Sequence, residues 1–236
     1  SIKVAEAAKV IENSQRDVNI AFINEMSKFT NKMNLNIYEI IDAMNTKWNA
    51  LGFTPGLVGG HCIGVDSCYL LEKVNDIGES ADVLQASRKV NEGMVEYVVD
   101  SIVSNLIEKK KVVKNCKVGI VGITFKENCA DIRNSKTVDL YRKLKSCGMN
   151  VILCDEVANP QEVKDMYDLD LQSVNKLNNL DVLILAIVNP EDEMFSAKKM
   201  NSMFRKMKDK DKIIVDIKGI YAHNKTLHDK FTYILL

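Results

Sequence analysis

One cysteine stands where a reactive thiol would be useful. The stretch GLVGGHCIGVD, residues 56–66, places Cys62 after a glycine-rich approach and four residues before Asp66. A substrate can approach a thiol flanked by glycines closely, and nearby cations or backbone donors favour the thiolate, which is the nucleophilic form. The alternative is a small packing residue, because free cysteines are often buried. The surroundings of Cys62 favour the nucleophile.

A second candidate pair is Lys9 and Asn13, in a segment with helical periodicity. Residues four apart lie on the same face of a helix, one turn from each other. An ammonium and an amide placed in this way could both hydrogen-bond one oxygen of a ligand. Surface lysines at helical spacing are far commoner than catalytic ones, so the spacing by itself leaves both readings open.

Metal binding is not expected. His61, Cys62 and Cys68 could ligate zinc, but adjacent ligands in a glycine loop, without a second CxxC pair, miss the spacing of structural zinc sites. The other four cysteines are expected to be packing residues at strand and helix ends: Cys116, Cys129, Cys147 and Cys154.

A charged cluster follows the first predicted strand of the second half. The stretch FKENCADIRNS carries Lys126, Glu127, Asp131 and Arg133, just beyond the strand KVGIVGI. Open α/β sheets bind ligands at this edge, where two cations could hold phosphates. The alternative is a solvated loop whose charges pair with each other. The preceding GIVGIT is not a dinucleotide fingerprint, because the GxGxxG spacing of glycines is interrupted.

Composition narrows the class of protein. The 236 residues are 46% hydrophobic, and 32 Lys and Arg balance 32 Asp and Glu. The chain is therefore expected to be globular, with no basic surface for nucleic acid and no membrane partner, since no apolar run approaches the roughly 20 residues of a span. Six irregularly spaced cysteines without a signal peptide indicate free thiols in the cytoplasm. The expected partner is a small molecule or another protein.

The first half of the chain is predicted to be helical. One long helix covers the opening segment, a second begins near Asn36, an irregular loop spans residues 52–64, and two more helices follow, the last over residues 81–110. The first helix is expected to bury one apolar face: Val4, Ala8, Ile11, Val18, Phe22, Phe29 and Met33. These long apolar faces favour packing against a second copy, a homodimer through the long helices, over packing on the second half of the chain.

The second half alternates short apolar strands with helices. The predicted strands are KVGIVGI, NVILCD, DVLILAI, KIIVDI and FTYILL. Such alternation predicts a parallel sheet with helices on its faces. The fold class is therefore α/β, with a helical domain over residues 1–112 followed by a parallel-sheet domain over residues 113–236.

Three stretches carry a resemblance to a known family. TKWNALGFTPGLVGGHCIGVDSCYL, GITFKENCADIRNSKTVDL and VDIKGIY resemble the middle and C-terminal domains of the UDP-glucose/GDP-mannose dehydrogenase family. The likeness spans essentially the whole chain and is greatest to the UDP-N-acetylhexosamine 6-dehydrogenases of capsule, O-antigen and Vi polysaccharide synthesis. It implies a helical dimerisation domain followed by a Rossmann-like UDP-binding domain. The family's N-terminal NAD-binding domain is expected to be missing from these 236 residues, so the chain alone is expected to be inactive.

The resemblance also implies an activity and catalytic residues. Members of the family oxidise the C6 alcohol of a UDP-sugar to a carboxylate in two steps, using two NAD⁺. Cys62 matches the nucleophile, which forms first a thiohemiacetal and then a thioester. Lys9 and Asn13 match residues that stabilise oxyanion character and assist proton transfer, and Asp66 matches the aspartate that positions the hydrolytic water.

Binding residues follow from the same resemblance. Phe125 and Lys126 match a substrate-binding pair, and Arg133 matches an arginine that reaches NAD. His61 stands where acetamido-sugar enzymes carry histidine, which favours an N-acetylated sugar; a hydrogen bond that shapes the loop is an equal alternative. Three glycines are expected to bring the backbone close to the sugar: Gly56, Gly59 and Gly60. The alternatives are a UDP-N-acetylmannosamine dehydrogenase and a stand-alone, dimeric UDP-sugar-binding module.

Overall fold

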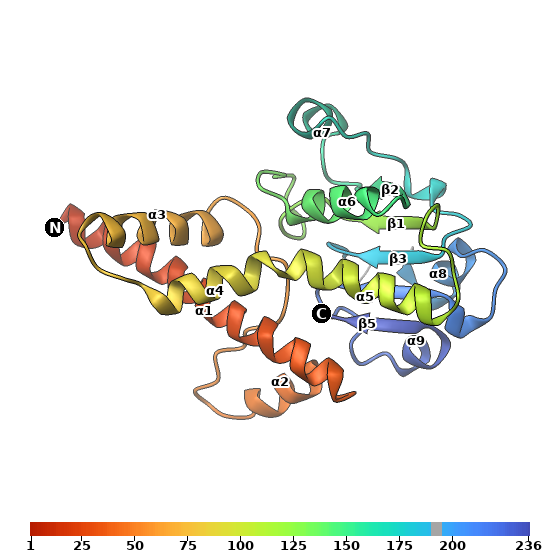
Figure 1. Ribbon diagram of the computed structural model, residues 1–236, viewed down its shortest axis with the longest axis horizontal. Helices are drawn as coiled ribbons and strands as arrows, with labels where there is room; N and C mark the ends of the chain where they lie inside the picture. The colour runs from red at the N-terminus through yellow and green to blue at the C-terminus, as the bar shows by residue number, and fades with distance from the viewer. Residues whose placement is uncertain (190–194) are drawn as a thin grey trace. The chain divides into compact units, whose positions relative to one another are not determined.

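The computed structural model describes residues 1–189 and 195–236, which form two compact units, Ser1–Met94 and Val95–Leu236 (Figure 1). The sequence predicts a domain boundary between residues 112 and 113, and the compact units of the structure divide earlier along the chain, after Met94. The difference arises because the helix α5, Met94–Glu108, belongs almost entirely to the unit that contains the sheet.

The first unit is helical, as predicted. It contains α1 (Ile2–Lys32), α2 (Ile37–Asn45), α3 (Ile63–Asp76) and α4 (Asp82–Glu92), and α1 packs against both α3 and α4. The predicted cap of the second helix is confirmed: the side chain of Asn36 accepts a hydrogen bond from the Tyr38 N–H at 2.9 Å. Such a cap satisfies one of the free donors at a helix start.

Helix α1 buries a different face from the one predicted. The members of the predicted apolar face are exposed or only half-buried, with Phe22 55% and Phe29 58% exposed. The inward face is mainly polar and includes Asn13, Ser14, Asp17, Asn24, Ser27 and Thr30. Periodicity identifies residues that share a face, but it does not say whether this chain covers that face. The expectation of burial is therefore wrong for the chain by itself.

The predicted helix over residues 81–110 is two helices. The first, α4, ends at Glu92 and the second, α5, begins at Met94, with Gly93 between them. A Cβ on Gly93 would lie 3.2 Å from the Lys89 carbonyl oxygen, which is a tight contact. Glycine is also a weak helix former, and these two properties account for a break at this position.

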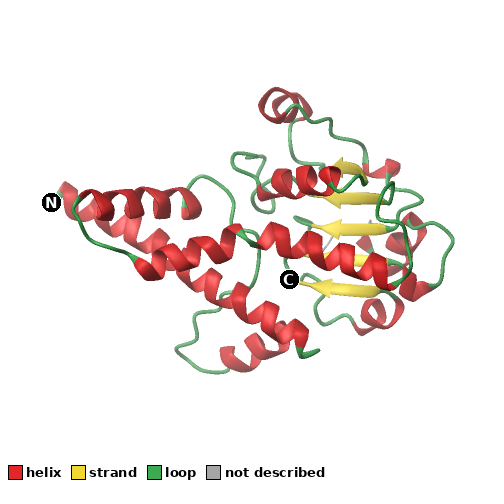
Figure 2. Cartoon of the chain, in the orientation of Figure 1, coloured by secondary structure: helices red, strands yellow, loops and turns green. Residues whose placement is uncertain are grey.

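The second unit is built on a five-stranded parallel sheet (Figure 2). The strand order is β2-β1-β3-β4-β5. The strands are β1 (Lys117–Val121), β2 (Asn150–Cys154), β3 (Val182–Leu185), β4 (Ile213–Asp216) and β5 (Thr232–Leu235). Each predicted strand is present, so the α/β fold class is confirmed.

Helices and short turns cover the sheet. They are α6 (Lys136–Ser146), α7 (Pro160–Tyr167), α8 (Ala197–Met203) and α9 (Lys225–Lys230), with the 3₁₀ turns η1 (Val174–Lys176) and η3 (Asp209–Asp211). Alternate residues of the central strands, such as Leu183 and Leu185, join Met200 and Phe231 in one apolar core. This sheet places the loops that follow its strands along one edge.

Candidate active site

Cys62 lies at the entrance to helix α3. Its side chain is exposed, and its carbonyl oxygen accepts the first hydrogen bond of the helix, from the Asp66 N–H at 2.8 Å. The imidazole Nδ1 of His61 lies 3.0 Å from the Cys62 Sγ. An exposed thiol at a helix N-terminus lies near backbone N–H groups, which stabilise negative charge. The first part of the sequence expectation, an accessible thiol rather than a buried one, is confirmed.

Asn13 and Asp66 meet although 53 positions separate them in the sequence. The Asn13 Nδ2 donates to the Asp66 Oδ2 at 2.5 Å, and this contact joins α1 to the first turn of α3. Asn13 is 4% exposed. Because Asp66 follows Cys62 by one helical turn, the amide, the carboxylate and the thiol belong to one small region of the helical unit.

Lys9 makes a local ion pair. Its Nζ lies 2.9 Å from Glu12 Oε2, and the lysine side chain is 65% exposed. Arg16 pairs with the same carboxylate. The hydrogen bonds from Arg16 and Lys9 lower the pKa of the Glu12 carboxyl to about 2. Lys9 therefore shares a helix with Asn13, but its ammonium interacts with Glu12 in this structure.

The three glycines of the loop differ in their surroundings. Gly56 is buried, and its N–H and carbonyl oxygen both hydrogen-bond to the side chain of Asn24, at 2.9 and 3.0 Å. Gly60 is buried with φ +82°, a conformation that favours glycine over other residues. Gly59 is half-buried. The backbone N–H of Gly56 thus holds the loop to α1 and is not free to meet a sugar.

The loop after β1 is fixed by an aspartate from the end of β2. Asp155 Oδ2 accepts hydrogen bonds from the Ile123 and Thr124 N–H groups at 2.7 and 3.3 Å. Its Oδ1 accepts two more, from Val157 and Ala158, both at 2.8 Å. The carboxylate of Asp155 therefore organises backbone at the carboxyl edge of the sheet.

The predicted binding residues of the sheet unit lie in this edge region. The Lys126 Nζ lies 5.3 Å from the centroid of the Phe125 ring. Arg133 is engaged by Asp131, with Nη2 2.6 Å and Nε 3.2 Å from Asp131 Oδ2. Of the two readings of the charged cluster, mutual pairing is therefore present for Arg133 and Asp131. The arginine side chain remains 58% exposed, so part of it faces solvent.

Sequence reasoning passed over Lys218, which belongs to the VDIKGIY stretch. It follows β4 by two residues, at the same carboxyl edge as the loop after β1. Burial lowers the pKa of the Lys218 ammonium, and the charge of Glu127 opposes that shift. The signal was available in the sequence, because the lysine directly follows the buried strand sequence KIIVDI.

Sequence reasoning also passed over a cluster of four buried polar residues that contacts the cysteine loop. Asp17, Asn24, Arg88 and Asn91 are each at most 8% exposed. Their spacing is a usable signal: Asp17 and Asn24 lie seven apart, and Arg88 and Asn91 three apart, so each pair shares a helix face.

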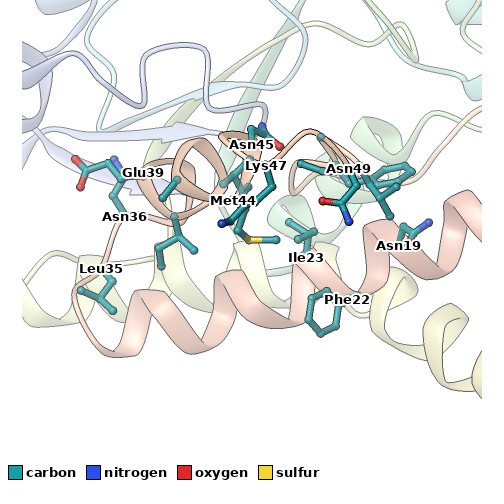
Figure 3. Close-up of a pocket in the computed structure, with 17 residues that line it drawn as sticks. Asn19, Phe22, Ile23, Leu35, Asn36, Glu39, Met44, Asn45, Lys47 and Asn49 are labelled. Atoms are coloured by element: carbon teal, nitrogen blue, oxygen red, sulfur yellow. The ribbon is translucent and has the colours of Figure 1, made fainter.

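An apolar pocket of about 880 Å³ lies elsewhere in the helical unit (Figure 3). Phe22 and Ile23 of α1 line one side, and Met44 of α2 lines the other. Leu51, in the loop after α2, is also part of the lining. The lining includes none of the predicted catalytic residues. Because its walls are mostly hydrocarbon, the pocket is suited to an apolar surface rather than to a sugar nucleotide.

Comparison with known proteins agrees with this arrangement. Residues 3–93 match the central domain of the UDP-glucose/GDP-mannose dehydrogenase family, and residues 119–223 match its UDP binding domain. The chain is 43% identical to Protein CapL of Staphylococcus aureus over 220 residues, 93% of this chain and 51% of that protein. It is 38% identical to the UDP-N-acetyl-D-glucosamine 6-dehydrogenase of Pseudomonas aeruginosa over 226 residues, 96% of this chain and 53% of that protein.

A solved structure shows the same fold. The UDP-N-acetyl-mannosamine dehydrogenase of Staphylococcus aureus superposes with a TM-score of 0.72 at 28% identity, over 98% of this chain and 50% of that one. The chain spans about half the length of each of these relatives. The two matched domains, in the family's order and over most of the sequence, show that this chain belongs to the UDP-glucose/GDP-mannose dehydrogenase family.

Proposed function

We propose that this chain is part of an NAD-dependent UDP-N-acetylhexosamine 6-dehydrogenase, which oxidises the sugar C6 alcohol to a carboxylate. The observation that carries the proposal is the exposed Cys62 at the start of α3, one helical turn before an aspartate that hydrogen-bonds to Asn13. The names of the relatives support an N-acetylated sugar, because the Pseudomonas aeruginosa protein is a UDP-N-acetyl-D-glucosamine 6-dehydrogenase.

The chemistry assigned to Cys62 is covalent catalysis. Its sulfur adds to the C6 aldehyde, so that an S–C bond forms and the former carbonyl oxygen takes up a proton, which gives a thiohemiacetal. Loss of a hydride from C6 and of the hydroxyl proton would convert that adduct to a thioester, with NAD as the hydride acceptor. Water then attacks the thioester carbon, the S–C bond breaks, and the carboxylate leaves while the thiol is restored. A covalent adduct divides the oxidation into steps and keeps the aldehyde bound.

The neighbours of Cys62 have roles suited to those steps. Asn13 presents amide N–H groups that can stabilise a developing oxyanion, and Asp66 can orient the attacking water. Lys9 would join them by leaving its exposed ion pair with Glu12. Exposed ion pairs contribute little to stability, so this rearrangement costs little.

Each unit carries residues that are proposed to bind substrate. In the cysteine loop, His61, Gly59 and Gly60 are proposed to contact the sugar, with Gly56 as the anchored start of that loop. In the sheet unit, Phe125 and Lys126 are proposed to contact the UDP portion. The loop that carries them is fixed through Asp155, which supports a preformed site.

NAD is the proposed hydride acceptor, but the sheet of this chain does not fit it. A Cβ on Gly122 would overlap the Ile187 carbonyl oxygen, so this glycine makes room for protein backbone rather than for a pyrophosphate. Both oxygens of Asp155 accept backbone N–H groups rather than facing a ribose. Arg133 is proposed to reach the dinucleotide from the edge, although here it pairs with Asp131. The 236-residue chain by itself is therefore expected to release no NADH.

We also propose a homodimer through the long helices, in which the second copy covers the apolar side chains of α1 that this chain leaves exposed. Val4, Ile11, Phe22 and Phe29 are each more than half exposed. Two of them, Phe22 and Ile11, line apolar pockets beside α2 and α3. Burial of such a surface in a homodimer would stabilise it at about 25 cal/mol per Å² of apolar area.

The dimer is tested by sedimentation equilibrium. Phe22→Asp and Phe29→Asp are expected to weaken self-association at least tenfold, because each places a charge in an apolar contact. Lys145→Asp, at an exposed position of α6, is the control and should not change it. A wild-type chain that stays monomeric at millimolar concentration would contradict the proposal.

A cytoplasmic setting is part of the proposal. All six cysteines, each within the described part of the chain, are free thiols. Among the described helices, none combines the length and the apolar character that crossing a bilayer requires.

Two alternatives are tested in the same assay. One is a UDP-N-acetylmannosamine dehydrogenase, an activity carried by a relative of the same fold. The other is a UDP-sugar-binding module without catalysis. We expect the longest gene product that contains this chain to release two NADH per UDP-N-acetylglucosamine or UDP-N-acetylgalactosamine. Preference for UDP-N-acetylmannosamine would favour the first alternative. Folded protein that binds the UDP-sugars without releasing NADH would favour the second.

A further inference from the structure

The segments before and after Cys62 both contact one cluster of buried polar residues, formed by Asp17, Asn24, Arg88 and Asn91. Asn24, fully buried on α1, accepts a hydrogen bond from the Gly56 N–H at 2.9 Å and donates one to the Gly56 carbonyl oxygen at 3.0 Å. One side chain thus satisfies both backbone polar groups of a buried residue, as a neighbouring strand would. Gly56 lies six residues before Cys62.

The same asparagine is itself held. Its Nδ2 donates to the Asn91 Oδ1 at 2.8 Å. The Asn91 Nδ2 in turn donates to the backbone oxygen of Asp17 at 3.0 Å and to the Asp17 Oδ1 at 2.7 Å. These bonds fix the orientation of both amides, because each amide oxygen accepts and each amide nitrogen donates. A misoriented Asn24 would leave buried groups unpaired.

Arg88 connects this cluster of buried polar residues to the segment that follows Cys62. Its Nη1 donates to the Asp17 Oδ1 at 3.0 Å, and its Nη2 pairs with Glu92. The guanidinium lies against the first turn of α3, since a Cβ on Gly64 would be 3.2 Å from Arg88 Nη1. Gly64 lies two residues after Cys62. Glycine at this position lets the helix start approach the guanidinium.

Packing alone does not account for these residues. A buried ion pair is often no more stabilising than apolar residues of the same volume, and buried polar groups tend to fix one arrangement rather than add stability. Here the arrangement that is fixed includes the backbone before and after Cys62. The cluster reaches that backbone through hydrogen bonds at Gly56 and close contact at Gly64.

We propose that Asn24, Asn91, Asp17 and Arg88 are positioning residues, which hold Gly56 and the first turn of α3 so that the Cys62 thiol keeps its place at the helix N-terminus. The proposal rests on the proposed function only in naming Cys62 as the nucleophile. Its direct prediction concerns the reactivity of the thiol, which can be measured without substrate.

The first measurement is the rate of Cys62 alkylation by iodoacetamide in the longest gene product. Trypsin places Cys62 and Cys68 in one peptide, Trp48–Lys73, so fragment ions from the same peptide report both sites, with Cys68 as the internal reference. The variant Asn24→Asp places an oxygen where Asn24 now donates to Gly56 and Asn91. We expect it to slow Cys62 alkylation about two- to fivefold and to move its pH profile, because the thiolate loses its fixed place near the backbone N–H groups.

Two controls separate positioning from stability. Ser27→Ala removes another fully buried polar group of α1, whose hydroxyl has no hydrogen-bond partner among the described residues. It should leave the alkylation rate unchanged. Ile41→Val and Ile41→Ala, in the buried part of α2, give a graded loss of Tm and should also leave it unchanged. Arg88→Lys, which keeps the charge but loses the planar fork, should slow alkylation as Asn24→Asp does.

The second measurement is steady-state kinetics of the same gene product. Asn24→Asp and Arg88→Lys are expected to lower kcat about 100-fold with KM within threefold, as a small misplacement of a reacting group does. Alkylation rates and pH profiles equal to wild type in both variants would overturn the proposal. The proposal would also be overturned if the losses of alkylation rate and of kcat followed the loss of Tm in the same way in the Asn24 and Ile41 variants. If wild type releases no NADH, the proposed function fails, and the alkylation data still decide whether these residues position Cys62.

Discussion

Helix α1 buries Asp17 and Asn24, whereas the central strand β3 buries four consecutive aliphatic residues, Val182–Leu185. In the helical unit, polar side chains meet inside and apolar side chains such as Phe22 and Phe29 lie outside. In the sheet unit, the core around the central strands is an apolar cluster, and the charged residues of the candidate site lie in loops at the edge. The comparison indicates a difference in design: the sheet unit is held together by its own core, while the helical unit fixes the loop that carries Cys62 and presents apolar side chains on its surface.

The comparison predicts two different ways to lose stability. In the helical unit, Arg88→Met leaves the fully buried carboxylate of Asp17 without its charged partner. Removal of one member of a buried pair costs about 3–5 kcal/mol of unfolding free energy. Urea unfolding, followed by hydrogen exchange of peptides from each unit, measures this loss and assigns it to the helical unit. The double variant Asp17→Asn/Arg88→Met should recover part of it, because no buried charge is then left unpaired. A double variant as unstable as the single one would contradict this explanation.

In the sheet unit, the largest losses come from cavities. Leu183 is fully buried in the core, and Leu183→Ala is expected to cost about 3 kcal/mol through lost contacts and the cavity left behind. The same urea and hydrogen-exchange measurement should assign the loss to the sheet unit. Leu183→Met, which conserves volume, is the control and should cost less than about 1.5 kcal/mol. Equal losses in the two variants would show that shape, rather than buried volume, dominates this core.

The smallest effect is expected on the exposed side of α1. Arg16 and Lys9 lower the pKa of the Glu12 carboxyl from 4.5 to about 2, so the pairs stabilise the folded state above pH 4.5. That contribution is lost as the pH falls through about 2, because the carboxylate is then protonated in both states. Glu12→Gln should therefore lower Tm slightly at pH 7 and not at pH 2, and added salt should reduce the difference. A difference that grows on acidification would contradict this sign.

The sequence was sufficient for the strands but not for the inward face of α1. Strands such as Val182–Leu185 are continuous aliphatic runs, which a parallel sheet buries on both faces, and each was predicted. The stripe that includes Phe22 and Phe29 was predicted to be buried because it repeats at helical spacing, yet it is exposed. Hydrophobic spacing identifies residues that share one face of a helix, and it does not say whether the chain itself covers that face.

The candidate site was also only partly predictable. The glycine-flanked position of Cys62 indicated an accessible thiol, and the thiol is exposed. The contact between Asn13 and Asp66 could not be read from the pattern, because it joins residues 53 apart through the packing of α1 on α3. The same holds for the bonds between Asn24 and Gly56, which depend on the path of an irregular loop. Local spacing predicts which residues are neighbours on one helix or strand, but it does not predict contacts between residues of two different elements.

The most direct test of the central claim is a comparison of two exposed cysteines. Cys62 and Cys68 are both exposed and lie at the start and within the first turns of α3, so serine at either position is a similar chemical change. With the longest gene product and UDP-N-acetylglucosamine, Cys62→Ser is expected to lower the rate of NADH release at least about 1,000-fold, because serine is a far poorer nucleophile at neutral pH. Cys68→Ser should retain nearly wild-type turnover with two NADH per sugar. Wild-type turnover in Cys62→Ser would contradict the assignment of Cys62 as the nucleophile.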